Sequence, residues 1–451
     1  MTTIFEPSRH VPVAYEADLC VVGGSCTGLF AAVRAARLGL RVALVEQHGV
    51  LGGMTTAAQV THWHCTMDMF CERKIIGGLA DEVVDRMRRR DAVVELPPPS
   101  RTQFKFNPAV LACELDALAV DNGIRLFLST QFSVPLVENG RIIAIIVEDK
   151  SGRRAIKAKV FIDASGDGDL LRRAGFQAVQ HMPLQPAAYQ VLAAGIQAVQ
   201  GTMSDGQVWD EVRSLAEKYG FPNSNPWLDI VPGVPGISNV FGARMNGVDG
   251  SDPDQLTAAL IEGRRTAVAY LDMIRERYGD VARDVALVAV AQALGVRETW
   301  HGVCRHRLTS DELLSGTRFD DAIANGIYPV DVHHPGGTLL RYLDGREDLI
   351  APCGEHNWGR WRSEDEPTPA CYHIPYRSLV PEGVTNLLVA GRLIDADRDA
   401  YGAIRVMVNC NQTGEAAGVA AALAVDGGVD MGDVPSDRLR AALAAGGSII
   451  V

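Results

Sequence analysis

The chain has 451 residues, which is more than one ordinary hydrophobic core accommodates, so we expect two or three domains. Its composition, 47% hydrophobic and 22% charged, is typical of a globular protein, and its formal net charge of −12 argues against nucleic acid or an anionic membrane as a partner. No apolar stretch reaches the roughly 20 residues of a membrane-spanning helix and residues 1–18 carry no signal-peptide pattern, so we expect a cytoplasmic protein without a membrane span.

The first fifty residues read as strand, helix, strand. An apolar run at Asp18–Val22 is broken by the segment Gly23–Gly28, and a helical pattern covers Leu29–Leu38. A second apolar strand covers Arg41–Glu46. Because two strands joined by such a helix form a right-handed parallel unit, we expect a Rossmann-like sheet to begin here.

The segment Gly23-Gly-Ser-Cys-Thr-Gly28 lies where dinucleotide-binding folds carry their glycine fingerprint. Gly23 permits the tight turn out of the strand, and Gly28 lets the helix pack closely on the sheet. The helix N-terminus then offers N–H groups and a positive dipole end to a pyrophosphate. Ser25 takes the place of the middle glycine, with Gly24 as an additional glycine. Glu46 ends the next strand, where a carboxylate accepts hydrogen bonds from ribose hydroxyls.

Helices and strands alternate in the next hundred residues. Ile76–Arg90 and Asn107–Asn122 are predicted helices, the second beginning at an Asn-Pro start signal. Arg125–Gln131 and Arg141–Glu148 are predicted strands of a β-meander, separated by turn-like Asn-Gly sequence. Val160–Asp163 is another buried strand.

The pattern changes beyond residue 176. Pro183–Val240 and His333–Tyr376 lack clean periodicity and are expected to be irregular, whereas Leu256–Tyr278 and Ser310–Gly326 are predicted helices.

The end of the chain is regular again, with a strand at Asn386–Ala390 and a small-residue helix at Thr413–Val425. We expect both ends to build one dinucleotide-binding domain, with residues 1–175 as its first part and 377–451 as its return segment. Residues 176–376 are expected to be mostly a substrate domain, in which 245–330 is helical and partly packed on the first domain.

Several further segments follow one another in the order of a known family: Leu51–Met54, Phe161–Asp169, Leu294–Glu298, Ile374–Arg377, Asn386–Arg392 and Gly402–Arg405. Together with the glycine loop they resemble the FAD-dependent oxidoreductases of the glutathione-reductase-like two-domain fold, and especially the bacterial family of that description. The resemblance implies an α/β protein with a Rossmann-like FAD-binding domain, made of a parallel sheet and a β-meander, and an inserted α+β substrate domain. The cofactor it implies is FAD, which makes the chain a flavoprotein.

The resemblance also implies that glycine-bearing strand ends hold the flavin. For Asp167, capping of its own turn is the alternative. The helix that follows Tyr401–Arg405 is implied to point at the flavin pyrimidine, where a positive helix end stabilises reduced flavin. The predicted cofactor-binding residues are Gly23, Gly24, Ser25, Gly28, Glu46, Gly52, Gly53, Met54, Gly166, Asp167, Gly391, Arg392, Ile404 and Arg405.

Two histidines follow the flavin-side glycine turn in Thr61-His-Trp-His-Cys65. His62 and His64 suit acid–base work on a substrate, because the pKa of histidine lies near neutrality. Covalent attachment of the flavin, a metal site with Cys71, and plain packing are the alternatives. Zinc ligands usually come as two spaced pairs and the second pair is missing, so no metal is predicted. The nine cysteines form no CxxC pair, which argues against a disulfide framework.

Further candidates lie later in the chain. Arg297, in Gly295–Glu298, is either a buried partner of Glu298 or a clamp for a substrate carboxylate. His333, His334, His373 and Tyr376 lie in segments expected to line a substrate cavity, and the last two are favoured because they directly precede the returning flavin domain.

The leading hypothesis is a dehydrogenase or oxidase that removes hydride from a small polar organic substrate to flavin N5. The chain has a single dinucleotide fingerprint, which fits electrons leaving to oxygen, a quinone or a carrier protein. A flavin monooxygenase or double-bond reductase is one alternative, and a flavin-binding subunit without its own substrate chemistry is another. Assembly into a homo-oligomer is left open.

Overall fold

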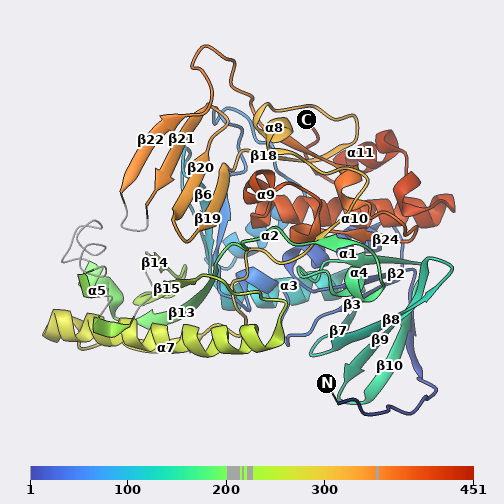
Figure 1. Cartoon of the computed structure of the whole chain (residues 1–451), viewed down its shortest axis with the longest axis horizontal. Helices are drawn as coiled ribbons and strands as arrows, with labels where there is room; N and C mark the ends of the chain where they lie inside the picture. Colours follow the sequence, from blue (N-terminus) through green and yellow to red (C-terminus); the bar gives the residue numbers. More distant parts are fainter. Residues whose placement is uncertain (1, 201–213, 216–217, 221–226, 352–354) are drawn as a thin grey trace.

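The computed structural model describes residues 2–200, 214–215, 218–220, 227–351 and 355–451. At its centre is a five-stranded parallel sheet with the strand order β24-β11-β2-β3-β7 (Figure 1). Its strands are β2 (Leu19–Val22), β3 (Val42–Val45), β7 (Arg125–Phe127), β11 (Val160–Asp163) and β24 (Leu387–Val389). They are mostly apolar because both faces of the sheet are covered. The predicted Rossmann-like unit is confirmed.

Alternate residues of β2 face two different layers. Leu19 and Val21 join the core formed with the helices, and Cys20 and Val22 join the core on the other face. The helical layer holds α1 (Cys26–Arg37), α2 (Leu79–Arg88), α3 (Pro108–Asp121) and α10 (Met407–Gly427). These elements match the predicted helices to within a few residues, except that α10 begins six residues before Thr413.

The β-meander covers the opposite face of the sheet (Figure 1). It consists of β8 (Gln131–Glu138), β9 (Arg141–Asp149) and β10 (Gly152–Lys157), with β1 (Val13–Glu16) added in parallel to β10. The prediction of one meander strand at Arg125–Gln131 is wrong. The chain splits there into β7 of the parallel sheet and β8 of the meander, because Ser129 has a left-handed φ of 49° that ends the extended run.

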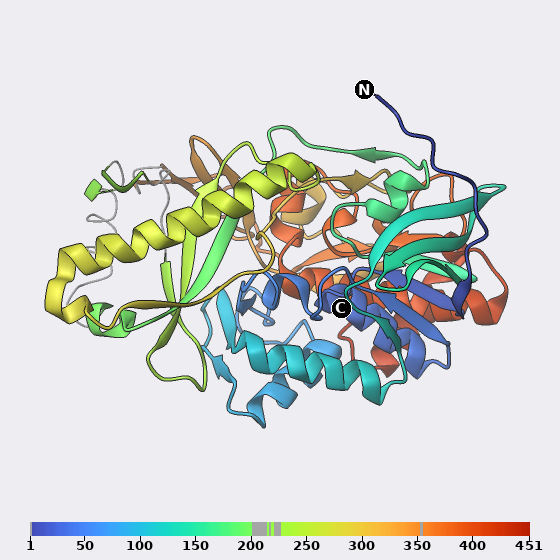
Figure 2. The same ribbon diagram turned by 90° about the horizontal axis from the view of Figure 1, so that it is seen from below.

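A second region is built around a long helix and an antiparallel sheet. The sheet has the order β14-β15-β13-β16, and α7 packs along it (Figure 2). The elements are β13 (Ala187–Ala194), β14 (Trp227–Ile230), β15 (Ile237–Met245), α7 (Pro253–Tyr278) and β16 (Ala286–Val290). The helix predicted at Leu256–Tyr278 is confirmed, with Asp252 as its N-cap. The segment Pro183–Val240 is more regular than expected, and its residues 201–213, 216–217 and 221–226 lie outside the described residues.

The prediction of one helix at Ser310–Gly326 is wrong. Only α8 (Ser310–Leu314) of the helix expected at Ser310–Gly326 forms, and β18 (Ala322–Gly326) pairs instead with β23 (Tyr372–Pro375). A fully buried strand lacks the alternation that distinguishes strands from helices in a sequence.

The segment expected to be irregular from His333 holds a second antiparallel sheet. Its strands are β19 (Val330–His334), β20 (Gly337–Arg341), β21 (Arg346–Ile350) and β22 (His356–Arg360). The region 245–330 was expected to be helical, but it contains the strands β16 and β18 in addition to the helices α7 and α8. The domain division at residues 175 and 376 stays a prediction.

Helices α1 and α10 cross in direct backbone contact. A Cβ added to Gly414 would lie 2.1 Å from the carbonyl oxygen of Thr27, and one added to Gly418 would lie 2.1 Å from that of Ala31. The two glycines therefore let the helices approach more closely than any side chain allows. This contact fixes the first turn of α1 relative to α10, which matters because both line the same cavity.

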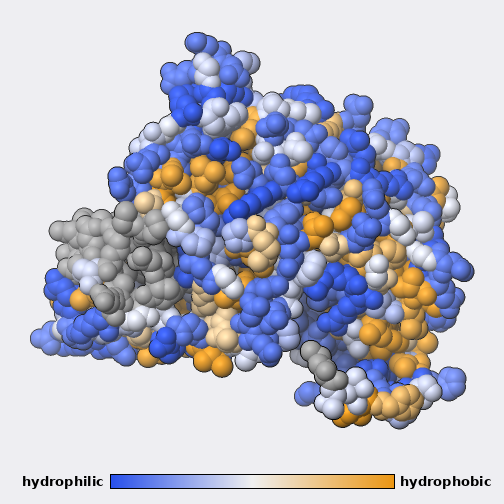
Figure 3. Space-filling model, viewed as in Figure 1, coloured by the Kyte–Doolittle hydropathy of each residue, from blue (hydrophilic) through white to orange (hydrophobic). Residues whose placement is uncertain are grey.

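Among the described residues, no helix is both long enough and apolar enough to cross a membrane. Hydrophilic residues cover most of the face in Figure 3, and its apolar areas are interrupted by them.

Candidate functional site

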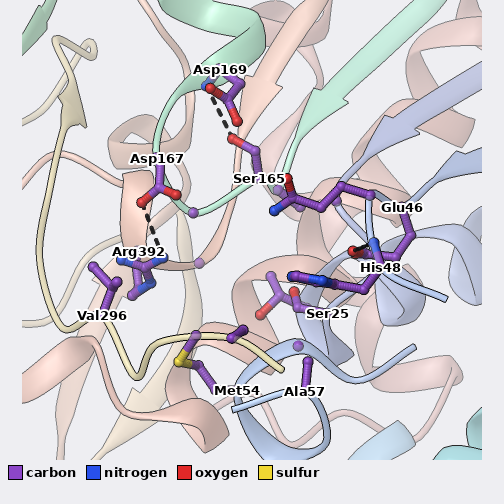
Figure 4. Close-up of a pocket in the computed structure, with 18 of the residues that line it drawn as sticks. Ser25, Glu46, His48, Met54, Ala57, Ser165, Asp167, Asp169, Val296 and Arg392 are labelled. Atoms are coloured by element: carbon purple, nitrogen blue, oxygen red, sulfur yellow. Dashed lines mark hydrogen bonds and ion pairs between the residues drawn. The ribbon is translucent and has the colours of Figure 1, made fainter. Parts of the chain in front are cut away.

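A cavity of about 240 Å³ lies over the carboxyl ends of the parallel strands, and we call it the glycine-loop cavity. Its wall includes the loop after β2, the first turns of α1 and α10, and Ala164–Asp167 after β11. Figure 4 shows Ser25 and Glu46 on one side of it and Asp167 with Arg392 on the other. Parallel α/β sheets bind their ligands at this edge, so the topology favours a bound nucleotide here.

The glycine loop has the geometry of a tight strand-to-helix turn. Gly23 has a φ of 103°, and a Cβ there would lie 2.3 Å from the carbonyl oxygen of Ala164. A Cβ on Gly28 would lie 1.9 Å from the carbonyl oxygen of Gly23. Ser25 has an ordinary φ of −61° and caps α1, because its Oγ accepts a hydrogen bond from the Gly28 N–H at 3.5 Å. The serine that replaces the middle glycine is thus compatible with the loop.

Glu46 is buried beneath the loop and ties it to the next strand. Its Oε2 accepts a hydrogen bond from the Gly24 N–H at 2.6 Å, and its Oε1 accepts one from the His48 N–H at 2.7 Å. Burial raises the pKa of this carboxyl, and the two N–H groups partly oppose that effect. Each oxygen keeps a further lone pair for a ribose hydroxyl.

On the other side of the cavity, Arg392 forms an ion pair with Asp167 at 3.3 Å. Gly166 lies directly against this arginine, since a Cβ there would come within 2.4 Å of Nη2. Nη1 of Arg392 is buried and has no hydrogen-bond partner among the described residues. Asp169 is also in the wall, and burial together with the nearby Asp167 raises its pKa to about 6.

The N-terminus of α10 contributes two further unpaired groups. Val406 precedes the helix without a side-chain cap, so the first N–H groups of α10 stay available. The buried Nδ2 of Asn411 has no partner among the described residues. These donors, with Nη1 of Arg392 and the N-terminus of α1, suit a ligand that has both anionic phosphates and ring carbonyls. The donor set therefore fits FAD.

Most of the predicted cofactor-binding residues line this cavity. They are Gly23, Ser25, Glu46, Gly52, Gly53, Met54, Gly166, Asp167, Gly391, Arg392 and Arg405. Gly24, Gly28 and Ile404 lie behind the wall, where the two glycines permit close packing of the loop. Ile404 is buried at the end of α9 (Arg398–Ile404).

A second cavity of about 210 Å³, which we call the arginine cavity, adjoins the first. The two share wall residues Met54, Val296, Arg392, Arg405 and Met407. The arginine cavity is also lined by residues of β4 (His62–His64), β13, β15 and β19. It therefore lies between the parallel-sheet region and both antiparallel sheets.

His62 and His64 both line the arginine cavity, with ring centroids 5.3 Å apart. Burial lowers the pKa of His62 to about 4 and the pKa of His64 well below its ordinary value. Both rings are therefore neutral near pH 7. The buried Nδ1 of His64 has no hydrogen-bond partner among the described residues, and its ring packs at 4.3 Å against Tyr328.

Asp331 is the one carboxylate in the described wall of the arginine cavity. It accepts a hydrogen bond from the Tyr328 hydroxyl at 2.6 Å and lies 3.3 Å from Nε2 of His333 and 3.5 Å from Nη2 of Arg405. Burial would raise the pKa of Asp331, but His333 and Arg405 outweigh it and hold that pKa below its ordinary value. Asp331 is thus an anion that interacts directly with Arg405 and with the Tyr328 hydroxyl.

Arg244 and Arg297 line the same cavity from β15 and from the segment after β16. Nη1 of Arg297 donates to the carbonyl of Pro186 at 2.6 Å, and Nη1 of Arg244 donates to Thr338 Oγ1 at 2.9 Å. Burial lowers the pKa of Arg297 to about 9, and the nearby Arg405 and Arg244 add to the effect. Arg297 does not pair with Glu298, whose carboxylate lies 3.3 Å from His301 instead.

His373 and Tyr376 do not lie in either described cavity wall. His373 is buried on β23 and shares a 3.1 Å hydrogen bond with Asn325. The Tyr376 hydroxyl donates to the carbonyl of Met431. The fold therefore brings His62, His64, Arg297 and His333 together and leaves these two residues apart.

Four ionisable wall residues were not singled out in the sequence: Arg101, Arg244, Tyr328 and Asp331. They come from separate segments that meet only in the folded chain, and no local spacing marks them.

A buried cluster of His181, Glu298 and His301 lies near this region, with its ligand-type atoms within 4.8 Å of one another. The two imidazole rings are stacked at 4.5 Å with an interplanar angle of 15°. A metal ion binds in the plane of each imidazole ring, and nearly parallel stacked planes do not converge on one ion. Arg307 also contacts Nε2 of His181 at 3.0 Å. The cluster is thus better suited to hydrogen bonding than to a metal.

Solved structures similar to this chain include several flavoproteins. A geranylgeranyl bacteriochlorophyll reductase-like protein from Thermoplasma acidophilum is 13% identical, with a TM-score of 0.48 over 96% of this chain and 83% of that one. A flavoprotein/dehydrogenase from Cytophaga hutchinsonii is 10% identical, with a TM-score of 0.45 over 94% and 82% of the two chains. The FAD-dependent myxobacterial chondrochloren halogenase is 13% identical, with a TM-score of 0.43 over 95% and 79%. No curated protein sequence matches the chain.

The model of one protein family, described as FAD dependent oxidoreductase, matches residues 18–443. The match spans the glycine loop, both cavities and the return segment of the parallel sheet. It agrees with the donor set of the glycine-loop cavity, and FAD is the cofactor. The chain belongs to the FAD dependent oxidoreductase family and is an FAD-dependent enzyme.

Proposed function

We propose that the protein is a dehydrogenase or oxidase that takes a hydride from a small polar organic substrate bound in the arginine cavity. The observation that carries this proposal is the shared wall, because Met54, Val296 and Arg405 face both cavities. A substrate in the arginine cavity would then lie next to the cofactor. When bound, FAD supplies a two-electron acceptor for the hydride that leaves the substrate carbon.

The cofactor would be held by residues of the glycine-loop cavity. We propose that Glu46 binds its ribose, that the N-terminus of α1 and Arg392 face its phosphates, and that Asn411 with the first turn of α10 faces its ring. The positive end of α10 would favour the reduced, more negative form of the ring. These roles use groups that have spare hydrogen-bonding capacity in the described structure.

We propose His64 as the proton acceptor. As the C–H bond of the substrate breaks, its O–H or N–H group must also lose a proton, and the product is a carbonyl compound or an imine. A neutral imidazole accepts that proton, and His64 is neutral, with a buried Nδ1 that has no hydrogen-bond partner among the described residues. His62, its neighbour in the wall, is the second candidate. Oxygen, a quinone or a carrier protein is proposed as the electron acceptor.

The direct test is anaerobic reduction of the bound flavin. The FAD-loaded protein would be mixed without oxygen with small hydroxy acids, amino acids, amines, alcohols and sugars, and its flavin absorbance followed. We expect at least one compound to bleach the flavin, and readmitted air or a quinone to restore the colour. A flavin that none of these compounds bleaches, but that NAD(P)H reduces, would contradict the proposal and favour a monooxygenase or double-bond reductase.

The pH profile tests the role of His64. Because burial lowers the pKa of His64, the imidazole stays neutral well below pH 6.5, and the rate of flavin bleaching is expected to stay constant down to that range. Below the folded pKa the rate should fall tenfold per pH unit, since only the neutral ring accepts a proton.

His64→Gln is expected to slow bleaching and to remove the decrease in rate at low pH, the acid limb of the profile. His306→Gln is the control, because His306 lies outside both cavity walls and contacts Glu312 at 3.2 Å. An acid limb that survives unchanged in His64→Gln would assign the proton acceptor to another group.

A further inference from the structure

We infer that the arginine cavity binds a small organic acid whose carboxylate is held by Arg244 and Arg297. This inference rests on the proposed function of the same cavity and names its substrate class. The cavity is lined by five arginines and, within the described residues, by one carboxylate, that of Asp331. Its three histidines, His62, His64 and His333, add no charge near pH 7 because burial keeps them neutral.

Two of the five arginines have protein carboxylates as partners. Arg392 pairs with Asp167 at 3.3 Å, and Arg405 pairs with Asp331 at 3.5 Å. Both line the glycine-loop cavity as well, so each lies where it can also contact the cofactor. Asp331 also accepts a hydrogen bond from Tyr328 and lies 3.3 Å from His333, so its single negative charge is shared among several neighbours and cannot balance all the arginines of the cavity.

Arg244 and Arg297 lack such partners. No carboxylate of the described chain lies within ion-pair distance of either guanidinium, and their recorded hydrogen bonds go to neutral oxygens of Thr338 and Pro186. Neither residue lines the glycine-loop cavity, so a bound cofactor is not their natural partner. Arg101, which also lines the arginine cavity and likewise has no ion pair among the described residues, is more exposed than Arg244 and Arg297.

Two unpaired guanidinium groups in one partly buried cavity repel each other. The low pKa of Arg297 reflects this repulsion as well as burial. Each group retains N–H donors in the planar fork that matches a carboxylate. An anionic ligand would both supply the missing charge and satisfy these donors, whereas a neutral alcohol or amine would leave the positive charges uncompensated.

Val296 joins this anion site to the cofactor. It directly precedes Arg297 and lines both cavities, and Figure 4 shows it near Arg392 at the wall of the glycine-loop cavity. An acid held by Arg297 would therefore lie beside the shared wall. His64 lies in the same cavity to take the proton.

Binding can be measured without turnover, through the change that a ligand causes in the absorption spectrum of the bound flavin. FAD-loaded protein would be titrated with lactate, malate and succinate, and with the matching neutral amides lactamide, malamide and succinamide. We expect at least one acid to bind about 100-fold or more tightly than its amide. Equal binding of every acid and its amide would overturn the inference.

Three variants locate the site. Arg297→Leu and Arg244→Leu are each expected to weaken binding of the acid at least 30-fold, with unchanged FAD content. Two variants are used so that one failure to fold leaves the other informative. Arg265→Leu on α7 is the matched control, because that arginine is exposed and, among the residues that the structure describes, pairs only with Glu262 on its own helix. Wild-type affinity for the acid in both cavity variants would overturn the inference.

The outcomes separate this inference from the proposed function. An acid that binds through Arg244 and Arg297 without any tested compound bleaching the flavin supports the anion site and contradicts the dehydrogenase proposal. Bleaching by a neutral alcohol or amine, with no preference for acids in binding, supports the dehydrogenase proposal and overturns the anion site.

Discussion

Replacing Glu46 with glutamine is expected to weaken FAD binding by roughly 100-fold. Both carboxylate oxygens already accept backbone N–H groups, from Gly24 at 2.6 Å and from His48 at 2.7 Å. An amide has a single acceptor oxygen, so its NH₂ group must face one of these donors. Hydrogen bonds to a charged group contribute about 1.5–3 kcal/mol each, and about 3 kcal/mol corresponds to the expected change in affinity. Fluorescence quenching of added FAD measures the dissociation constant.

The matched control is Glu16→Gln, the same chemical change at the end of another strand. The Glu16 side chain is 65% exposed and lies 3.8 Å from Lys157, so its loss should leave FAD affinity unchanged. Far-ultraviolet circular dichroism of the protein without FAD would check that Glu46→Gln still folds. A folded Glu46→Gln protein that binds FAD within threefold of wild type would show that this carboxylate does not hold the ribose.

The parts of the fold that could be predicted are those with local signals. The unit from β2 to β3 is marked by two apolar strands, a glycine turn and a helix within thirty residues of sequence. The strand β18 could not be predicted, because its partner β23 lies about fifty residues further on and its own alanine-rich sequence suits a helix equally well. Its conformation is decided by burial and long-range pairing, which a local pattern does not record.

The same contrast holds for the candidate site. The glycine-loop cavity is built from short motifs at strand ends, so most of its wall was predictable residue by residue. The arginine cavity combines one or two residues from each of β4, β15 and β19, and only the folded chain shows that Arg244 and Asp331 line the same cavity as His64. His373 and Tyr376 were favoured for their position in the sequence, yet they lie in other parts of the core.

The contact between α1 and α10 leads to the second large expected effect, in which a better helix former destabilises the protein. Alanine stabilises a helix interior by about 1 kcal/mol relative to glycine. At Gly418, however, the new Cβ would lie 2.1 Å from the carbonyl oxygen of Ala31. We expect Gly418→Ala to lower the free energy of unfolding by about 2 kcal/mol or more, because α10 must move away from α1. Denaturant unfolding of the FAD-loaded protein measures the change. The dependence of the unfolding free energy on denaturant concentration would be compared with that of the wild type.

Gly427→Ala at the C-terminal end of α10 is the control. Its Cβ would meet only Val429 at 3.8 Å, so that variant should be as stable as wild type or slightly more stable. Trimming a side chain on α1 cannot rescue Gly418→Ala, because the atom it approaches belongs to the backbone. Thr27, which makes the corresponding contact with Gly414, lines the glycine-loop cavity, so we also expect Gly414→Ala to lose FAD affinity. A Gly418→Ala protein with wild-type stability would mean that the two helices tolerate a wider separation than the structure shows.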